Sequence, residues 1–282
     1  MANVLKREKQ LAVLGALVEG NSLRSVERMT GVQKKTVANL LVRVGDGCER
    51  LLDEKMRNLD CRRFELDEIW SFVQKKQRHV DPATDPYEVG DTWTYVALDA
   101  ETKLVPSYLV GKRGAHETRL FVEDLASRLK HRVQISTDGL KLYVEAIEQA
   151  FGADVDYAQV VKEFEVEPIG PGRYSPPKVS SVEKTIITGA PEKSKISTSY
   201  VERQNLTMRM KMRRFTRLTN AFSKKLDNHK AAVALHFAHY NFVAIHGTLR
   251  VTPAMAANVT QSVWSMEDLL DRALGNDEPV PS

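Results

Sequence analysis

Apolar residues in the first 60 positions recur with a helical period and are interrupted by short polar turns. The pattern predicts one helix around residues 11–17 and a second from a cap at Asn21 or Ser22 to about Met29. After a Gly-containing turn, a third helix is predicted over residues 33–43. Two short helices joined by such a turn are typical of a helix-turn-helix unit, so residues 1–60 are predicted to form a small all-α domain.

The third predicted helix has a polar outward face. In a helix-turn-helix unit this face meets DNA, and here it carries side chains that bond phosphates and base edges. These are Lys34, Lys35, Thr36, Asn39 and Arg43. Three-helix units also serve as plain protein-interaction modules, and this alternative stays open at the level of the pattern.

From about residue 61 the pattern changes to strands alternating with helices. Strands are predicted over residues 62–73, 92–99, 103–110, 132–137 and 155–161, with helices over 116–130 and 142–151. The order is three strands, a helix, a strand, a helix and a strand. It predicts an α/β domain with a mixed five-stranded sheet and flanking helices over residues 61–250.

Pro, Gly, Ser and Lys dominate residues 165–198, which are predicted to form a long loop inserted into this domain. Loops of that length in a compact domain are usually functional or disordered. Helices are expected next over residues 200–213 and 220–245. Residues 251–282 are expected to hold a C-terminal helix and a disordered tail.

Composition narrows the class of protein. With 282 residues, 42% hydrophobic and 28% charged, the chain is an ordinary globular protein. No apolar run reaches the ~20 residues that cross a bilayer, and the first residues lack a signal-peptide core, so we expect no membrane and a cytoplasmic location. Cys48 and Cys61 have neither disulfide-framework nor zinc-site spacing, and are expected to be reduced and packed.

Positive charge is concentrated late in the chain. Residues 198–250 contain ten Lys or Arg and two acids, Glu202 and Asp227. Such a concentration favours a polyanionic partner, nucleic acid in particular, and would associate the protein with the nucleoid. A merely solvated helix face, the alternative, normally carries both signs of charge.

Three acids occupy positions that a sheet can bring together. Asp67 lies within the first strand, Asp138 follows the fourth, and Glu202 opens the helix after the long loop. If the first and fourth strands are neighbours, the three carboxylates would repel one another unless hard cations lie among them. Mg²⁺ prefers such oxygen ligands, and two ions about 4 Å apart suit phosphodiester chemistry.

Each acid also has a structural explanation. Asp138-Gly139 is a common turn dipeptide, and Ser199-x-x-Glu202 matches a capping box. Alternation along the first strand puts Asp67 and Glu68 on opposite faces without deciding which one is functional. The seven histidines show no metal-ligand spacing, and His236, His239 and His246 are expected to pack in the core or contact the backbone.

Four segments together resemble the insertion-sequence-one family of bacterial transposases, which have an Asp-Asp-Glu site on a ribonuclease-H-like core. The segments are ELDEIWSFV, STDGLKLY, ISTSYVERQNLTMRMKMRRFTRLTNAFSKKL and HYNFVAIHGTLRVTPAMAA. The resemblance covers residues 65–257. It implies a ribonuclease-H-like sheet, with Asp67, Asp138 and Glu202 as catalytic residues and ligands of Mg²⁺ or Mn²⁺, two ions being expected.

The reaction implied is metal-dependent hydrolysis that frees a 3′-OH at the end of a mobile element, followed by attack of that hydroxyl on target DNA. The implied partner is double-stranded DNA, as terminal inverted repeats and as target, bound by a homodimer or a higher assembly. Basic and amide residues beside Glu202 would contact the DNA. These are Arg203, Asn205, Arg209, Lys211, Arg213 and Arg214.

The chain departs from the family pattern in two places. Many members begin with a zinc-binding finger, and this sequence has no such cysteine set. Residues 81–91 lengthen the connection after the first strand. A catalytically silent, domesticated DNA-binding regulator and a ribonuclease-H-type nuclease remain the alternative functions.

Overall fold

A six-stranded mixed sheet is the centre of the computed structural model, which describes residues 5–85, 87–164, 179–217 and 219–275. Its strand order is β3-β2-β1-β4-β5-β6. The strands are β1 (Arg63–Val73), β2 (Gly90–Asp99), β3 (Ser107–Gly111), β4 (Val133–Thr137), β5 (Val155–Phe164) and β6 (Val179–Thr188). The predicted α/β class with a mixed sheet is confirmed.

Strand β1 lies between β2, with which it pairs antiparallel, and β4, with which it pairs parallel. The first and fourth strands are therefore neighbours, which is the condition for bringing their acids together. Leu66 pairs with Thr137 at the end of the β1–β4 register. Asp67, the next residue of β1, and Asp138, the residue that follows β4, thus lie at the same end of the two paired strands.

The predicted number of strands, five, is wrong, because β6 lies in the segment expected to be a loop. It pairs antiparallel with β5 and is exposed along almost its whole length. Its β-branched residues favour a strand, but no buried face gives it an alternating pattern. Strand β3 is also shorter than predicted, since it begins only after Pro106.

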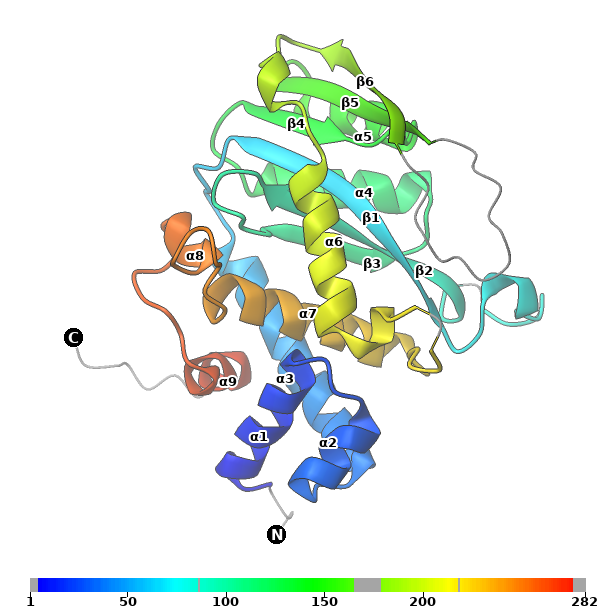
Figure 1. Cartoon of the computed structure of the whole chain (residues 1–282), viewed down its shortest axis with the longest axis vertical. Coiled ribbons are helices and arrows are strands. Elements are labelled where there is room, and N and C mark those ends of the chain that lie inside the picture. Colours follow the sequence, from blue (N-terminus) through cyan, green and yellow to red (C-terminus); the bar gives the residue numbers. More distant parts are fainter. Residues whose placement is uncertain (1–4, 86, 165–178, 218, 276–282) are drawn as a thin grey trace.

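Helices cover both faces of the sheet (Figure 1). Helices α4 (Ala115–Ser127) and α5 (Leu142–Phe151) pack together on one face, and α6 (Ser199–Lys211) crosses the other over β1 and β2. The buried residues of α6 recur at helical spacing, which gives the helix one face toward the sheet. They are Val201, Gln204, Asn205 and Met208.

The N-terminal helices are α1 (Arg7–Val18), α2 (Leu23–Thr30) and α3 (Lys34–Lys55). Ser22 caps α2, and Gly31 ends it in the left-handed conformation, as the predicted turn requires. Helix α3 continues well beyond residue 43 and packs on α7 (Leu226–Phe242) and α9 (Met266–Leu274). One continuous hydrophobic core joins these helices to the sheet.

The remaining helices are short: η1 (Gln77–His79), η2 (Lys193–Lys195), η3 (Arg213–Phe215) and α8 (Pro253–Ala256). Among the described residues, no helix combines the length and apolar character needed to cross a membrane. Cys48 and Cys61 are free thiols and buried, as predicted. The predicted tail, apart from Gly275, lies outside the described residues.

Two glycines allow α3 to approach its neighbours closely. A Cβ added at Gly45 would lie 2.5 Å from Cα of Ala231 on α7. One added at Gly47 would meet the backbone carbonyl of Ala273 on α9. Glycine lowers helix propensity, which explains why the sequence pattern predicts too short a helix.

Replacing Gly45 with Ala should therefore destabilise the protein, because α3 and α7 would have to separate. We expect a loss of about 1–3 kcal/mol in the free energy of unfolding, despite the better helix propensity of Ala. Gly15→Ala in α1 is the matched control, since nothing lies within 4 Å of the added Cβ. It should be neutral or stabilising by up to about 1 kcal/mol in denaturant unfolding. Equal effects of the two substitutions would contradict the close-packing explanation.

His229 of α7 is fully buried against β1 and the segment before α7. Its Nε2 lies 3.2 Å from Ser71 Oγ, and its Nδ1 lies 3.0 Å from Ser223 Oγ. Burial, together with the nearby Arg214 guanidinium, lowers the pKa of His229 from 6.5 to about 3. The folded protein therefore holds this imidazole neutral.

A histidine with a depressed folded pKa stabilises the protein fully above its unfolded pKa of 6.5, and that contribution is lost as the pH falls toward 3. His229→Gln, which keeps hydrogen-bonding atoms without a titrating ring, should reduce the acid sensitivity. Between about pH 7.5 and about pH 5, its loss of unfolding free energy should be smaller than wild type by about 2 kcal/mol. Parallel pH profiles of the two proteins in denaturant titrations would refute this.

Candidate active site

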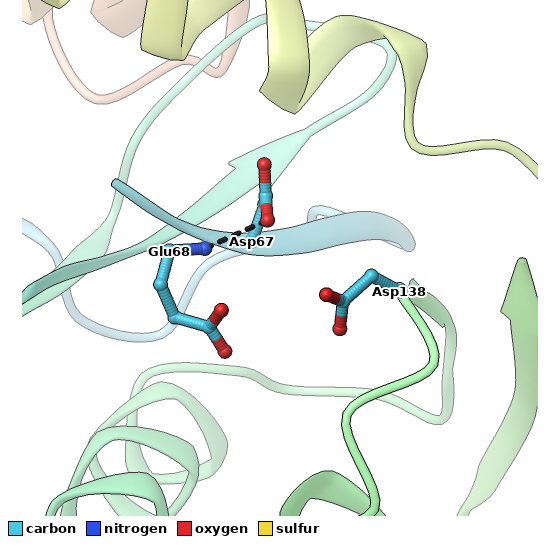
Figure 2. Close-up of side chains that lie close together, drawn as sticks. All are labelled: Asp67, Glu68 and Asp138. Atoms are coloured by element: carbon cyan, nitrogen blue, oxygen red, sulfur yellow. Dashed lines mark hydrogen bonds between the residues drawn. The ribbon is translucent and has the colours of Figure 1, made fainter. Parts of the chain in front are cut away.

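Three carboxylates meet where β1 and β4 stop pairing. Asp67 and Glu68 are consecutive on β1, and Asp138 directly follows β4. One oxygen of each lies within 4.8 Å of the others. Figure 2 shows Asp67 and Glu68 leaving β1 on opposite sides, with the carboxylate of Asp138 turned toward them. Such a set is suited to a divalent cation with oxygen ligands.

Burial and mutual repulsion raise the pKa of two of these acids. The pKa of Asp67 rises to about 6, first through burial and then through Asp138, with Glu202 adding to the repulsion. The pKa of Glu68 rises to about 7, again through burial and then Asp138, although Arg113 opposes the change. Both effects mean that the site stabilises an added positive charge, either a proton or a cation.

Hydrogen bonds fix the orientation of Asp67 and Asp138. Asp67 accepts from the Glu68 backbone N–H at 2.9 Å and from the side-chain amide of Asn205 at 2.8 Å. Asp138 accepts from the Leu140 backbone N–H at 3.0 Å. The turn explanation for Asp138-Gly139 therefore holds alongside a ligand role, because the bond to Leu140 leaves one carboxylate oxygen of Asp138 outside the turn.

Glu65 holds the start of α6 against β1. Its Oε2 accepts from the backbone N–H groups of Tyr200 at 2.7 Å and Val201 at 3.1 Å, and the residue is 2% exposed. A carboxylate on these otherwise unpaired N–H groups also interacts favourably with the helix dipole. The strand that carries Asp67 thus caps the helix that carries Glu202.

The capping box considered for Ser199 and Glu202 does not form. The N-cap residue is Thr198, and the Ser199 hydroxyl lies 2.9 Å from that of Ser197. Glu202 instead accepts a hydrogen bond from the Thr198 hydroxyl at 2.7 Å and pairs with Lys162 of β5. Its role at the helix start is thus different from the one that the sequence pattern suggested.

Glu202 lies at the rim of the carboxylate group. Its side chain is 43% exposed, and its charge contributes to the raised pKa of Asp67. Among the described residues, the set within ligand distance comprises Asp67, Glu68 and Asp138, and Glu202 is not in it. The structure thus brings two of the three predicted acids together and leaves the third close by, engaged with Lys162.

The sequence pattern did not predict three charged residues of this site. Glu65 caps α6, Lys162 pairs with Glu202, and Arg113 pairs with Glu68. Glu65 had a signal, because strand alternation puts it on the same face as Asp67. Lys162 and Arg113 had none, since their partners, Glu202 and Glu68, are far away in the sequence. Arg113 Nη2 lies 3.4 Å from Glu68 Oε2.

The residues predicted to contact DNA divide into two sets. On α3 the side chains of Lys34, Lys35, Thr36, Asn39 and Arg43 are all exposed. On and after α6, the side chains of Arg203, Lys211 and Arg213 are exposed, and Lys211 pairs with Glu19 of α1.

Three further residues of this group lie deeper. Asn205 is buried against Asp67, and Arg209 is partly buried. Arg214 donates to the Ser223 hydroxyl at 2.8 Å, and burial lowers its pKa to about 10. The DNA-contact role stays a prediction for both sets, and the described packing gives Asn205 and Arg214 internal partners.

No protein-family model and no curated protein matches the chain. Among solved structures, the chain is similar to the piggyBac transposase in a synaptic complex with hairpin DNA, with a TM-score of 0.42 and 9% identity over 97% of this chain and 72% of that one. It is similar to the Mos1 transposase in a paired-end complex with the left transposon end, with a TM-score of 0.21 and 18% identity over 53% and 59% of the two chains.

A Mos1 strand transfer complex gives a TM-score of 0.23 and 19% identity, over 55% of this chain and 59% of that one. The chain thus spans less than two thirds of the Mos1 chains that it matches. These TM-scores are too low for the likenesses to indicate a function. The carboxylates and the residues around them are the features that bear on function.

The Glu65 cap should be measurable as local stability of α6. Glu65→Ala leaves two N–H groups without their acceptor and should cost about 2–3 kcal/mol. Glu65→Gln keeps an acceptor without the charge and should cost about 1 kcal/mol. Hydrogen exchange followed by mass spectrometry should show faster exchange in α6 than in α7 for both variants. Uniform acceleration across the two helices would show that the cap has no specific effect on α6.

Proposed function

We propose that the chain is an Asp-Asp-Glu transposase of a bacterial insertion sequence, acting in the cytoplasm at the nucleoid. The observation that carries the proposal is the meeting of Asp67 and Asp138 at the end of paired strands β1 and β4, with Glu202 close by on α6. A helix capped by the strand of the first acid gives the third acid a defined position. The resemblance of the sequence segments around all three acids supports the same function.

The site fits divalent cations. Asp67, Asp138 and Glu202 would hold two Mg²⁺ or Mn²⁺ ions. The raised pKa values of Asp67 and Glu68, caused first by burial and then by Asp138, support this proposal because the site favours an added positive charge. Bound there, such ions activate an attacking oxygen and stabilise the leaving oxygen of a phosphodiester.

The residues of the chain itself supply the positioning. Asn205 donates to one oxygen of Asp67 and the Glu68 backbone N–H donates to the other, so the carboxylate keeps a fixed orientation. Lys162 pairs with Glu202, and the pair would separate if a cation bound Glu202 or a DNA phosphate bound Lys162. Arg203 and Arg213 are exposed on the same segment as Glu202, where they would bind the phosphates of the cleaved strand.

DNA recognition is assigned to the α2–α3 unit. The exposed polar face of α3 would bind the terminal inverted repeats, and a second copy of the chain would bind the other end of the element. At least a dimer is therefore expected when end DNA is present, as sizing of the protein with and without that DNA would reveal.

The test uses the full chain, Mn²⁺ or Mg²⁺, and DNA duplexes taken from the two flanks of its gene. Wild type should release a 3′-OH at the element ends and join it to target DNA. Asp67→Asn and Asp138→Asn should lower both activities by roughly 100-fold or more, because a metal ligand is lost. Glu183→Gln removes an exposed acid of β6 and is the matched control, with activity expected at the wild-type level.

The alternative functions give different results in the same assay. A catalytically silent regulator would bind the flanking duplexes without metal-dependent nicking. A ribonuclease-H-type nuclease would cut but form no joined product. Wild-type rates in Asp67→Asn would contradict the proposed site directly.

A further inference from the structure

Glu68 has no role in the three-acid scheme, yet its carboxylate faces the same site from the other side of the sheet. Its side chain is 1% exposed. Arg113 contacts Oε2 at 3.4 Å, while Oε1 has no hydrogen-bond partner among the described residues. Figure 2 shows the Glu68 carboxylate turned toward that of Asp138. A buried carboxylate oxygen without a partner needs an additional polar or charged species.

Tyr143 of α5 supplies a second unpaired atom at the same place. The residue is fully buried, and its hydroxyl has no hydrogen-bond partner among the described residues. Burial raises the pKa of Tyr143, and the charges of Glu68, Asp67 and Asp138 raise it further. The hydroxyl lies beside the Glu68 carboxylate, although the two groups do not form a well-aligned hydrogen bond. Two buried polar atoms from different elements thus lie side by side on the α5 side, and neither has a well-formed hydrogen bond among the described residues.

The charge on that side favours a cation over a neutral molecule. Asp67, Glu68 and Asp138 all contribute oxygens, whereas the cation in contact with Glu68 is Arg113, which also lies 4.7 Å from the centre of the Trp93 ring. A water molecule would satisfy the hydrogen bonds but would leave the repulsion between carboxylates in place. An oxygen-ligated divalent cation would satisfy both.

We propose that Glu68 is a fourth metal ligand, so that Asp67, Glu68 and Asp138 hold one divalent cation on the α5 side of the sheet. The other cation would lie toward α6, between Asp67, Asp138 and Glu202. Consecutive residues of β1 point to opposite faces of the sheet. Asp138, which follows the last pair of the β1–β4 register, would be shared by the two cations. This inference rests on the proposed metal site, and its test separates the two.

Binding of Mn²⁺ alone to the full chain provides the test. The number of ions bound can be counted by electron paramagnetic resonance of the free ion, and the affinities measured by calorimetry. Wild type should bind two ions per chain. Glu68→Gln, which keeps the shape of the side chain, should lose one site or weaken it roughly tenfold or more, while the other site remains. Asp67→Asn should weaken both sites.

Two further variants guard against a trivial folding effect. Arg113→Gln removes the cation that competes for Glu68, and should tighten the α5-side site severalfold without loss of a site. Tyr143→Phe should keep two sites. Both changes preserve every carboxylate, and Mn²⁺ should raise the melting temperature of each variant.

The outcomes are distinct. If Glu68→Gln binds two ions with wild-type affinity while Asp67→Asn loses them, the role of Glu68 is refuted and the proposed function stands. If neither variant changes Mn²⁺ binding, the metal site of the proposed function fails as well. If Arg113→Gln leaves both affinities unchanged or weaker, Glu68 is only a partner of Arg113 and Tyr143, and the inference fails.

Discussion

Partly buried negative charge at the end of two paired strands is the constraint around which this protein is organised. Asp67 and Asp138 are brought together by the β1–β4 pairing itself, so their repulsion is part of the fold. Polar and basic groups from the surrounding elements compensate the negative charge of the acids. The amide of Asn205 on α6 donates to Asp67, Lys162 of β5 pairs with Glu202, and Arg113 before α4 pairs with Glu68. The pKa values of Asp67 and Glu68 remain raised, first through burial and then through the charge of Asp138, so the site still favours an added positive charge.

Much of this arrangement could be predicted from local patterns. Period-2 and period-3.6 spacing located β1, β2, β4, β5 and most helices, and two acids at the ends or middles of strands proved to be neighbours. The pattern failed where the deciding interaction is remote in the sequence. Strand β6 has no buried face and exists through its pairing with β5, and α3 extends past residue 43 because its glycines fit against α7 and α9. The partners of Glu202 and Glu68 are equally distant, so no spacing rule could name Lys162 or Arg113.

The acids also show that structural and chemical roles are not exclusive. Asp138 closes its own turn through Leu140 and still lies within ligand distance of Asp67. Glu202 is tied to the first turn of its helix through Thr198 and to β5 through Lys162. In both cases the hydrogen bond to the neighbouring backbone or side chain restricts the rotation of the carboxylate. Such restriction would hold the carboxylate ready for the metal-ligand role proposed for it.

The contact of Glu65 with the start of α6 has a consequence for how the chain can vary. Glu65 lies two residues before Asp67 on the same face of β1. It accepts a hydrogen bond from the backbone N–H of Tyr200, which lies two residues before Glu202 on α6. The relative position of the first and third acids is thus set by a strand and a helix in direct contact, whatever the length of chain that joins β5 to α6. Exchanges of the exposed residues of β6, which lies in that connection, would therefore leave the two acids in register, so the surface of β6 can vary for reasons unrelated to these acids.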